Sequence, residues 1–178
     1  MLADRVRIGR EKGKIEYIGE VYLAQDDDFV RVNNRWVYRG SELEIEIPHI
    51  IQGEKVISYS YMFYGTGDYL ATPVTRVDSN NKKVTHMTYM FHNSSATTLD
   101  LSSFDTSNVI NMYFMFRDSS ATTLDLSSFD TSKVTNMGGM FRDSSATTGY
   151  ARTQEDADNL NSSSNKPAGL TFVVKPEE

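Results

Sequence analysis

The sequence predicts an α/β repeat solenoid of short parallel strands and short helices, with an antiparallel β cap at its N-terminus. A motif of the form Val-x-x-Met-x-x-Met-Phe occurs three times at a constant spacing of 25 residues, in residues 84–91, 109–116 and 134–141. We call these the Met-Phe segments. A strand-like Leu-Asp-Leu sequence precedes the second and the third of them, whereas residues 1–42 lack the motif. A fixed period of this length is typical of stacked units that cannot bury their apolar faces alone.

The N-terminal quarter is predicted to be a separate β cap or attachment region, residues 1–42. Residues 15–23 and 29–38 alternate apolar and polar side chains, as strands do. Asn33 and Asn34 tolerate the left-handed backbone conformation of a tight turn, so a hairpin is expected there. Residues 43–178 then form the predicted solenoid, which includes a C-terminal capping unit.

The Met-Phe segments predict short helices with one buried stripe. At about 100° per residue, Val84, Met87, Met90 and Phe91 fall on one face of a helix. A degenerate copy in residues 56–63 extends the pattern upstream. The aspartates before the second and third segments, Asp105 and Asp130, suit helix N-caps.

Short strands are predicted between the helices. Leu99 and Leu101 point to one face of a strand and Asp100 to the other. Strands near residues 45, 72, 99, 124, 149 and 171 are expected to align as one parallel ladder. Near the C-terminus, Thr153 and Asp156 suit a capping box that opens a polar helix ending near Asn161, followed by a closing strand at 170–174.

Residues 99–116 and 124–141 resemble the BspA-like leucine-rich repeat family, whose unit is roughly Leu-Asp-Leu-Ser-x-Phe-Asp-Thr-Ser-x-Val-x-x-Met-x-x-Met-Phe. The resemblance implies a right-handed, leucine-rich-repeat-like solenoid used for recognition or adhesion. Such repeats occur in bacterial surface proteins and in some phage or prophage proteins. Residues 37–43, Val-Tyr-x-Gly-Ser-x-Leu, are similar to a short β motif of phage minor tail proteins. This second resemblance favours a tail-associated member of the family.

Composition excludes several classes of protein. The net charge of −6 disfavours binding to duplex nucleic acid, because phosphate contacts need a basic face. The absence of cysteine excludes disulfides and thiolate sites. Residues 1–20 contain no apolar run, so neither a signal peptide nor membrane insertion is expected. The predicted location is therefore a virion, as part of a phage tail, or the extracellular cell surface.

No catalytic or metal-binding pattern is present. The chain has three histidines, and it lacks a phosphate-binding glycine loop and zinc-ligand spacing. Asp100 and Asp125 are expected about 4.8 Å apart on adjacent strands. Their repulsion is tolerable on a wet surface, so no cation is needed. We expect no enzymatic activity, no cofactor and no metal.

Two surfaces are candidates for binding. Between the Met-Phe segments, Thr88-Tyr89 becomes Tyr113-Phe114 and then Gly138-Gly139, while the apolar positions stay constant. Aromatic and arginine side chains are common anchors of recognition surfaces. The first candidate surface is therefore an aromatic patch formed by Tyr89, His92, Tyr113, Phe114, Arg117 and Arg142. The second is the face of the predicted strands, with Asp100, Ser102, Asp125 and Ser127.

These expectations point to a non-catalytic recognition or adhesion protein, with phage tail attachment to a host surface as the first hypothesis. The alternatives are a bacterial cell-surface adhesin that binds host protein or glycan, or a purely structural assembly scaffold. The expected partner is a cell-surface protein or glycan, and possible further partners are other phage structural proteins and other copies of the chain.

Overall fold

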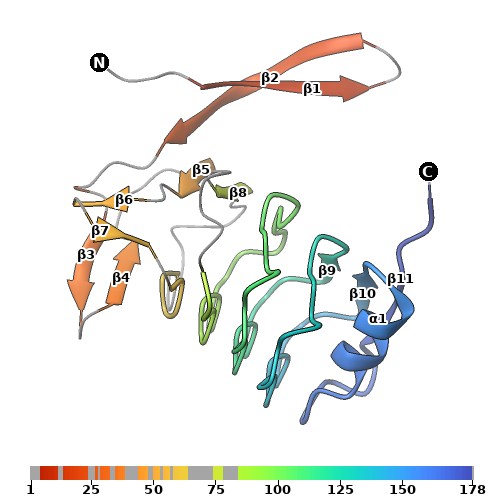
Figure 1. The fold of residues 1–178 in the computed structure, drawn as a ribbon. Coiled ribbons are helices and arrows are strands. Elements are labelled where there is room, and N and C mark those ends of the chain that lie inside the picture. The colour runs from red at the N-terminus through yellow and green to blue at the C-terminus, as the bar shows by residue number, and fades with distance from the viewer. Residues whose placement is uncertain are drawn as a thin grey trace.

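The computed structural model describes residues 5–11, 14–23, 27, 29–32, 35–38, 44–47, 50–52, 54–56, 58–63, 74–77 and 84–177. Within these residues the chain is mostly strand and turn (Figure 1). The helix α1 (Gln154–Asn161) is the only helix in this part of the chain. It is polar, and no helix of the described ranges is both long and apolar enough to span a bilayer.

The strands form several small sheets. One sheet has the order β1 (Arg5–Glu11), β2 (Lys14–Leu23), β5 (Glu44–Ile47), β8 (Val74–Val77), with β1 antiparallel to β2 and the other pairs parallel. Two antiparallel pairs are β3 (Phe29–Val32) with β4 (Arg35–Tyr38), and β6 (Ile50–Ile51) with β7 (Glu54–Lys55). A parallel sheet has the order β11 (Thr171–Val174), β10 (Thr148–Ala151), β9 (Thr123–Leu126).

The predicted α/β repeat solenoid, with leucine-rich-repeat-like strands and helices, is wrong. The Met-Phe segments form successive turns instead of short helices, and one helix near the C-terminus is all that the described residues contain. The backbone explains why. Tyr89, Phe114 and Gly139 have φ angles of 57°, 55° and 58°, which interrupt a right-handed helix between the two methionines of each segment.

The expected single parallel ladder of strands is also wrong. β5 and β8 belong to one sheet and β9, β10 and β11 to another. Residues 99–101, where a strand was expected, form no strand. The equivalent residues 25 positions later lie in β9 and do show the predicted alternation, with Leu124 and Leu126 buried and Asp125 half-buried.

Backbone hydrogen bonds that a helix would keep to itself run between neighbouring segments. In the first Met-Phe segment, alternate N–H groups donate to the second: Met87 N to Asn111 O (2.9 Å), Tyr89 N to Tyr113 O (3.0 Å) and Phe91 N to Met115 O (2.9 Å). The second donates to the third in the same pattern: Met112 N to Asn136 O, Phe114 N to Gly138 O and Phe116 N to Met140 O. The segments therefore lie side by side (Figure 1).

The predicted core positions are buried although no helix forms. Val84, Met87, Met90 and Phe91 are each at most 1% exposed, and the corresponding side chains of the second segment are fully buried. Phenylalanine rings stack through the core, with centroids 5.5 Å apart for Phe91 and Phe116. The turn thus buries the same side chains that the helix was expected to bury.

The N-terminal end of this core is covered by the β3–β4 pair. The N–H of Tyr38 in β4 donates to Met62 O (2.9 Å), and the Tyr38 ring packs between those of Phe29 and Phe63. The antiparallel β3–β4 pair matches the predicted hairpin, although Asn33 and Asn34 lie outside the described residues. The division into 1–42 and 43–178 stays a prediction.

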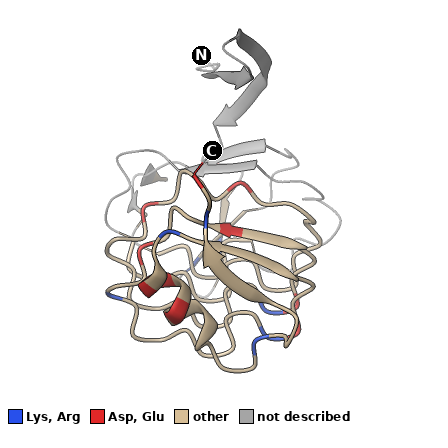
Figure 2. Ribbon diagram, turned by 90° about the vertical axis from the view of Figure 1, so that its right-hand side faces the viewer, with Lys and Arg blue, Asp and Glu red and all other residues tan. Residues whose placement is uncertain are grey.

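The predicted C-terminal helix is confirmed as α1. Thr153 is its N-cap, and the Thr153 side chain accepts a hydrogen bond from Asp156 N. Ala157 and Leu160 are its buried apolar residues. Figure 2 shows acidic residues on this helix, which faces the viewer there. The predicted closing strand is β11.

Candidate functional site

Three aromatic residues occupy equivalent positions with an unusual backbone conformation. Tyr61, Tyr89 and Phe114 lie in successive segments and have φ angles of 63°, 57° and 55°. A left-handed conformation is uncommon for bulky residues. Their side chains are half-buried, whereas the neighbouring methionines are fully buried. The turn therefore separates these rings from the core.

Four aromatic side chains form a continuous group, which we call the aromatic row: Tyr61, Tyr89, Tyr113 and Phe114. The Tyr61 and Tyr89 rings are stacked with centroids 4.6 Å apart. The Tyr89 ring meets the edges or faces of Tyr113 and Phe114 at 5.7 and 5.3 Å, and those two rings stack at 3.9 Å. Contacts of this kind hold aromatic side chains in fixed orientations.

A cation lies at each end of the aromatic row. The guanidinium carbon of Arg35, in β4, lies 4.1 Å from the Tyr61 ring centroid. The guanidinium carbon of Arg117 lies 4.9 Å from the Phe114 ring centroid. Cation–π contacts at such distances are attractive. The Arg117 guanidinium also pairs with a carboxylate, since its Nε lies 3.1 Å from Asp118 Oδ2.

His92 packs against the row as a largely uncharged ring. Its imidazole stacks on Tyr89 at 5.3 Å, and its Nε2 lies 3.8 Å from a carboxylate oxygen of Asp118. Burial lowers the pKa of His92, although the Asp118 carboxylate acts in the opposite direction. His92 therefore contributes an aromatic face at neutral pH and not a positive charge.

The row ends on two glycines of the third segment. A Cβ atom at Gly139 would lie 2.1 Å from Phe114 Cε1, and one at Gly138 would lie 3.2 Å from Tyr113 Cδ2. The Tyr113 and Phe114 rings thus lie over the backbone of Gly138 and Gly139. A larger residue at either position would displace these rings from their present orientations.

The structure brings most of the first predicted patch together. Tyr89, His92, Tyr113, Phe114 and Arg117 form one set of contacts. Arg142 lies apart from them, because its Nε pairs with Asp143 Oδ2 at 3.2 Å and it lines a separate pocket.

Two members of the site were missed by sequence reasoning, Tyr61 and Arg35. Tyr61 precedes Tyr89 by 28 residues, the same offset that relates residues 56–63 to 84–91, so the alignment of the degenerate copy could have found it. Nothing in the sequence indicates that Arg35 would lie over Tyr61, because that contact depends on how β4 packs.

The polar residues of the second predicted surface make local contacts. Ser102 N donates to Asp100 Oδ1 and Ser127 N donates to Asp125 Oδ1, both at 3.1 Å. Lys175 Nζ also lies 2.6 Å from Asp125 Oδ2. Burial acts to raise the pKa of Asp125, but hydrogen bonds from Lys175 and Ser127 outweigh it and lower that pKa. These carboxylates stabilise turns, as short polar side chains often do.

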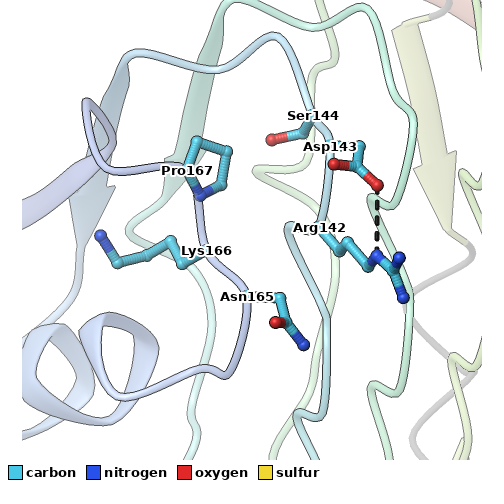
Figure 3. Close-up of a pocket in the computed structure, with 6 residues that line it drawn as sticks. All are labelled: Arg142, Asp143, Ser144, Asn165, Lys166 and Pro167. Carbon is cyan, nitrogen blue, oxygen red and sulfur yellow. Dashed lines mark hydrogen bonds and ion pairs between the residues drawn. The ribbon is translucent and has the colours of Figure 1, made fainter.

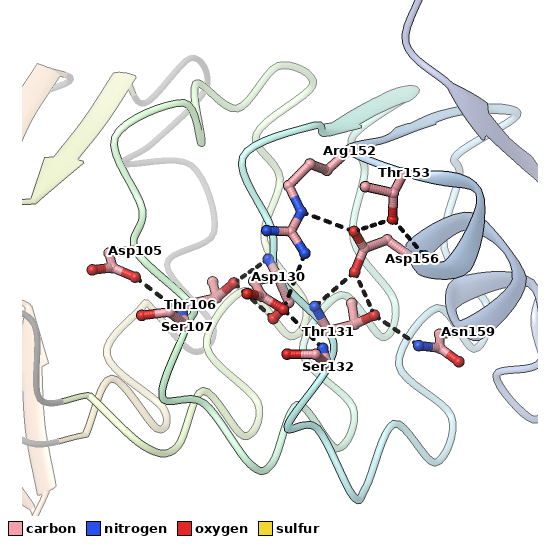
Figure 4. Close-up of polar contacts among 10 residues, drawn as sticks. All are labelled: Asp105, Thr106, Ser107, Asp130, Thr131, Ser132, Arg152, Thr153, Asp156 and Asn159. Atoms are coloured by element: carbon pink, nitrogen blue, oxygen red, sulfur yellow. Dashed lines mark hydrogen bonds and ion pairs between the residues drawn. The ribbon is translucent and has the colours of Figure 1, made fainter.

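Asp105 and Asp130 make the side-chain bonds expected of caps, but no helix follows them. Ser107 N donates to Asp105 Oδ1 (3.0 Å) and Ser132 N to Asp130 Oδ1 (2.9 Å). Each aspartate therefore accepts a hydrogen bond from the backbone N–H two residues later, as a cap would, but this bond closes a turn and does not begin a helix (Figure 4).

A buried carboxylate, Asp156, ties α1 to the preceding segment (Figure 4). It accepts hydrogen bonds from Thr131 N and Thr131 Oγ1 (both 2.8 Å), Arg152 Nε (2.9 Å) and Thr153 Oγ1 (2.7 Å). Burial acts to raise its pKa, but these donors lower the pKa to about 2. Every oxygen of this carboxylate has protein donors, so its role is structural.

The chemistry of the assembled site is that of non-covalent binding. The aromatic row offers ring faces flanked by cations. Among the described residues, no group of three or more His, Asp or Glu side chains lies close enough together to hold a metal ion.

Comparison with known protein families identifies the chain's relatives. The family described as "Mycoplasma protein of unknown function, DUF285" matches residues 57–164, more than half of the 178 residues. No curated protein and no solved structure matches the chain. The matched family is of the BspA-like surface type, so that part of the resemblance is confirmed, whereas nothing in the comparisons supports a phage or prophage origin. The aromatic row and the Met-Phe segments on which it is built lie within the matched residues, and the chain belongs to the DUF285 family.

Proposed function

We propose that this protein is a non-catalytic recognition protein that binds a cell-surface ligand through the aromatic row. The observation on which this rests is the row itself: four partly exposed aromatic rings in contact, with Arg35 and Arg117 at its ends. Aromatic and arginine side chains dominate recognition surfaces. Their faces suit both the apolar face of a sugar ring and the side chains of a protein ligand.

The row is organised before a ligand arrives. The left-handed turn positions fix the backbone beneath Tyr61, Tyr89 and Phe114, and ring–ring contacts fix the side chains. Binding to such a surface loses little side-chain entropy, which favours affinity. The strand-face residues give less support to a binding role because their carboxylates already accept local hydrogen bonds.

Membership in the family favours a bacterial surface adhesin that binds host protein or glycan. A tail-associated phage protein is the second candidate, and it rests on the short motif in residues 37–43. In the third reading the chain is a structural scaffold. The three readings predict different targets: animal cells for the adhesin, bacterial cells for the tail protein, and copies of the chain itself for the scaffold.

The test measures binding of the fluorescently labelled protein to cultured animal cells and to a panel of bacterial cells. The informative variant combines Tyr113→Gly with Phe114→Gly. It reproduces the pair found at 138–139, and glycine suits the left-handed backbone at position 114. We expect saturable binding by the native chain and its loss in this variant, with the variant still folded by circular dichroism.

The matched control combines Ser102→Ala with Ser127→Ala on the second predicted surface. It should bind as the native chain does. Loss of binding in this control alone would move the site to the strand face. Absence of binding to every cell type, together with stable self-association, would contradict the proposal and favour the scaffold.

A further inference from the structure

A polar pocket opens where the hydrogen bonding between segments stops (Figure 3). Asp118 N donates to Arg142 O at 3.0 Å, but no carbonyl of the described residues accepts the next equivalent N–H, that of Asp143. Side chains replace backbone partners nearby, since Gly139 N donates to Ser164 Oγ at 3.0 Å. The resulting open pocket, of about 730 Å³, is what we call the end pocket. It is lined by Arg142, Asp143, Ser144, Asn165, Lys166 and Pro167.

One hydroxyl in the end pocket differs from its counterparts. Ser94 and Ser119, at the equivalent positions of the two preceding units, accept hydrogen bonds from Ala96 N and Ala121 N. The Oγ of Ser144 is buried and has no hydrogen-bond partner. Figure 3 shows this oxygen directed toward the side of the pocket formed by Pro167. A buried polar group without a partner is costly, so this hydroxyl is suited to a ligand.

The charged groups of the pocket are largely balanced. Arg142 and Asp143 pair at 3.2 Å through a single guanidinium N–H, which leaves the other guanidinium donors and carboxylate lone pairs side by side. Lys166 Nζ donates to Leu170 O. An anion bound here would face the Asp143 carboxylate, and this repulsion argues against phosphate or a uronate as the preferred ligand.

We propose that the end pocket binds one neutral sugar ring of a glycan. Neighbouring hydroxyls of a pyranose both donate and accept, which matches an adjacent carboxylate and guanidinium together with the Ser144 hydroxyl and the Asn165 amide. Pro167 supplies an apolar wall for the C–H face of the ring. Small-molecule sites commonly combine such an apolar wall with a few placed polar groups.

This inference rests on the proposed recognition function, and it makes a glycan the ligand class. Arg142 occupies the position of Arg117 one unit further along the chain, and Arg117 packs on the last ring of the aromatic row. The end pocket therefore lies one repeat of 25 residues beyond the last ring of the aromatic row along the chain.

The direct test is a ¹H–¹⁵N NMR titration of the whole chain with glucose, galactose, mannose and N-acetylglucosamine, each added separately, and with inorganic phosphate. We expect at least one of the sugars to cause saturable shifts of the Asp143, Ser144 and Lys166 amides, and phosphate to cause none. If no sugar shifts these amides, the proposal is wrong. Shifts caused by phosphate and not by sugars would likewise overturn it, in favour of an anion site.

Two variants localise the binding. Ser144→Ala should weaken the sugar's Kd about 3- to 10-fold, the usual effect of one hydrogen bond. Asn165→Gly should weaken it similarly while keeping the left-handed backbone, since φ at Asn165 is 58°. Ser145→Ala, at an exposed neighbour outside the pocket lining, should leave the Kd unchanged. A native Kd in both pocket variants would overturn the proposal.

The Tyr113→Gly and Phe114→Gly double variant separates this inference from the proposed function. Because these residues do not line the end pocket, that variant should keep the sugar shifts while losing cell binding. If sugars shift the pocket amides but the native chain binds no cell, the pocket proposal is supported and the recognition function is contradicted. If the native chain binds cells but no sugar shifts these amides, the recognition function is supported and the pocket proposal is contradicted.

Discussion

Asp156 shows how one residue ends the series of units. Thr106 and Thr131 are buried at equivalent positions 25 residues apart, and Asp156 takes the next such position. Thr106 exchanges bonds with Asp130, accepting from its N–H at 2.7 Å, whereas Asp156 draws together Thr131, Thr153 and Arg152. The carboxylate satisfies donors from the third unit and from the start of α1, so it joins the last unit to the helix that covers it.

The chain is expected to lose stability in acid through this residue. The pKa of Asp156 is about 2 when folded, below the ordinary value of 3.8. Its contribution, about 2 kcal/mol, is therefore complete above pH 4 and lost as the pH falls from about 4 to about 2. Urea unfolding at a series of pH values should show this loss, and Asp156→Asn should lower stability at pH 7 and make the loss in acid smaller. The control is Asp158→Asn, at an exposed aspartate of α1, which should keep the native pH dependence of stability. If Asp156→Asn also kept that pH dependence, the loss of stability in acid could not be assigned to Asp156.

At the scale of the element, the Met-Phe segment is a turn whose shape depends on one left-handed residue. That position holds Tyr89, then Phe114, then Gly139, at nearly equal φ angles. This position can therefore hold an aromatic residue or a glycine, provided that its side chain does not clash with the aromatic ring at the equivalent position of the preceding segment. In its observed orientation, the Phe114 ring occupies the space that a Cβ atom at Gly139 in the next segment would need.

Gly139→Ala is expected to destabilise the chain by about 1–3 kcal/mol, because the new Cβ clashes with the Phe114 ring and a non-glycine residue must hold φ near +58°. Adding Phe114→Gly should recover part of this loss, since the clash disappears. The four urea unfolding curves of this double-mutant cycle measure the coupling. Gly169→Ala, where nothing lies within 4 Å of the added Cβ, is the control. Strictly additive effects of the two substitutions would show that ring and glycine are not in contact.

At the scale of the whole molecule, one apolar cluster extends from Phe29 near the N-terminus to Phe172 in β11. Each Met-Phe segment contributes a layer to it, and the phenylalanine stack joins the layers. A cluster without interruption favours unfolding as a single cooperative transition.

Met112→Ala tests the central layer. Its side chain is fully buried, so truncation should cost about 2–5 kcal/mol through lost contacts and a cavity. Ile110→Ala, two residues away, removes a side chain that is 40% exposed and should cost much less. Thermal unfolding of both variants makes the comparison, and equal losses would contradict the orientation assigned to this segment.

The sequence allowed us to predict which side chains of the Met-Phe segments are buried. It did not allow us to predict that these segments are turns and not helices. The spacing of Val84, Met87, Met90 and Phe91 fits one face of a helix, and this turn buries the same four side chains. The decisive feature is the left-handed backbone at Tyr89 and Phe114, and bulky residues give no sign of it. Only Gly139, in the third segment, is of a residue type that adopts this conformation readily, because glycine has no Cβ atom.

The site was predicted in part for a related reason. Tyr89, Tyr113 and Phe114 vary among constant apolar positions, so comparison of the segments indicates that they are on a surface. The contact of Arg35 with Tyr61 depends on how distant segments pack, as do the hydrogen bonds from Thr131 to Asp156. Such contacts between parts of the chain leave no local pattern in the sequence.

The regular hydrogen bonding between Met-Phe segments has a consequence for how the chain reaches its native state. The bonds join residues 24 or 25 apart, such as Met87 N to Asn111 O and Ile110 N to Thr85 O, so every step closes a loop of nearly the same size. Loop-closure entropy depends on loop length and not on how many units already exist. Once one pair of segments has formed, each added segment encounters the same entropic barrier and gains a similar set of contacts. Folding from such a nucleus is expected to proceed as growth at constant cost per unit, without the slow search for distant partners that limits sheets with long-range pairing.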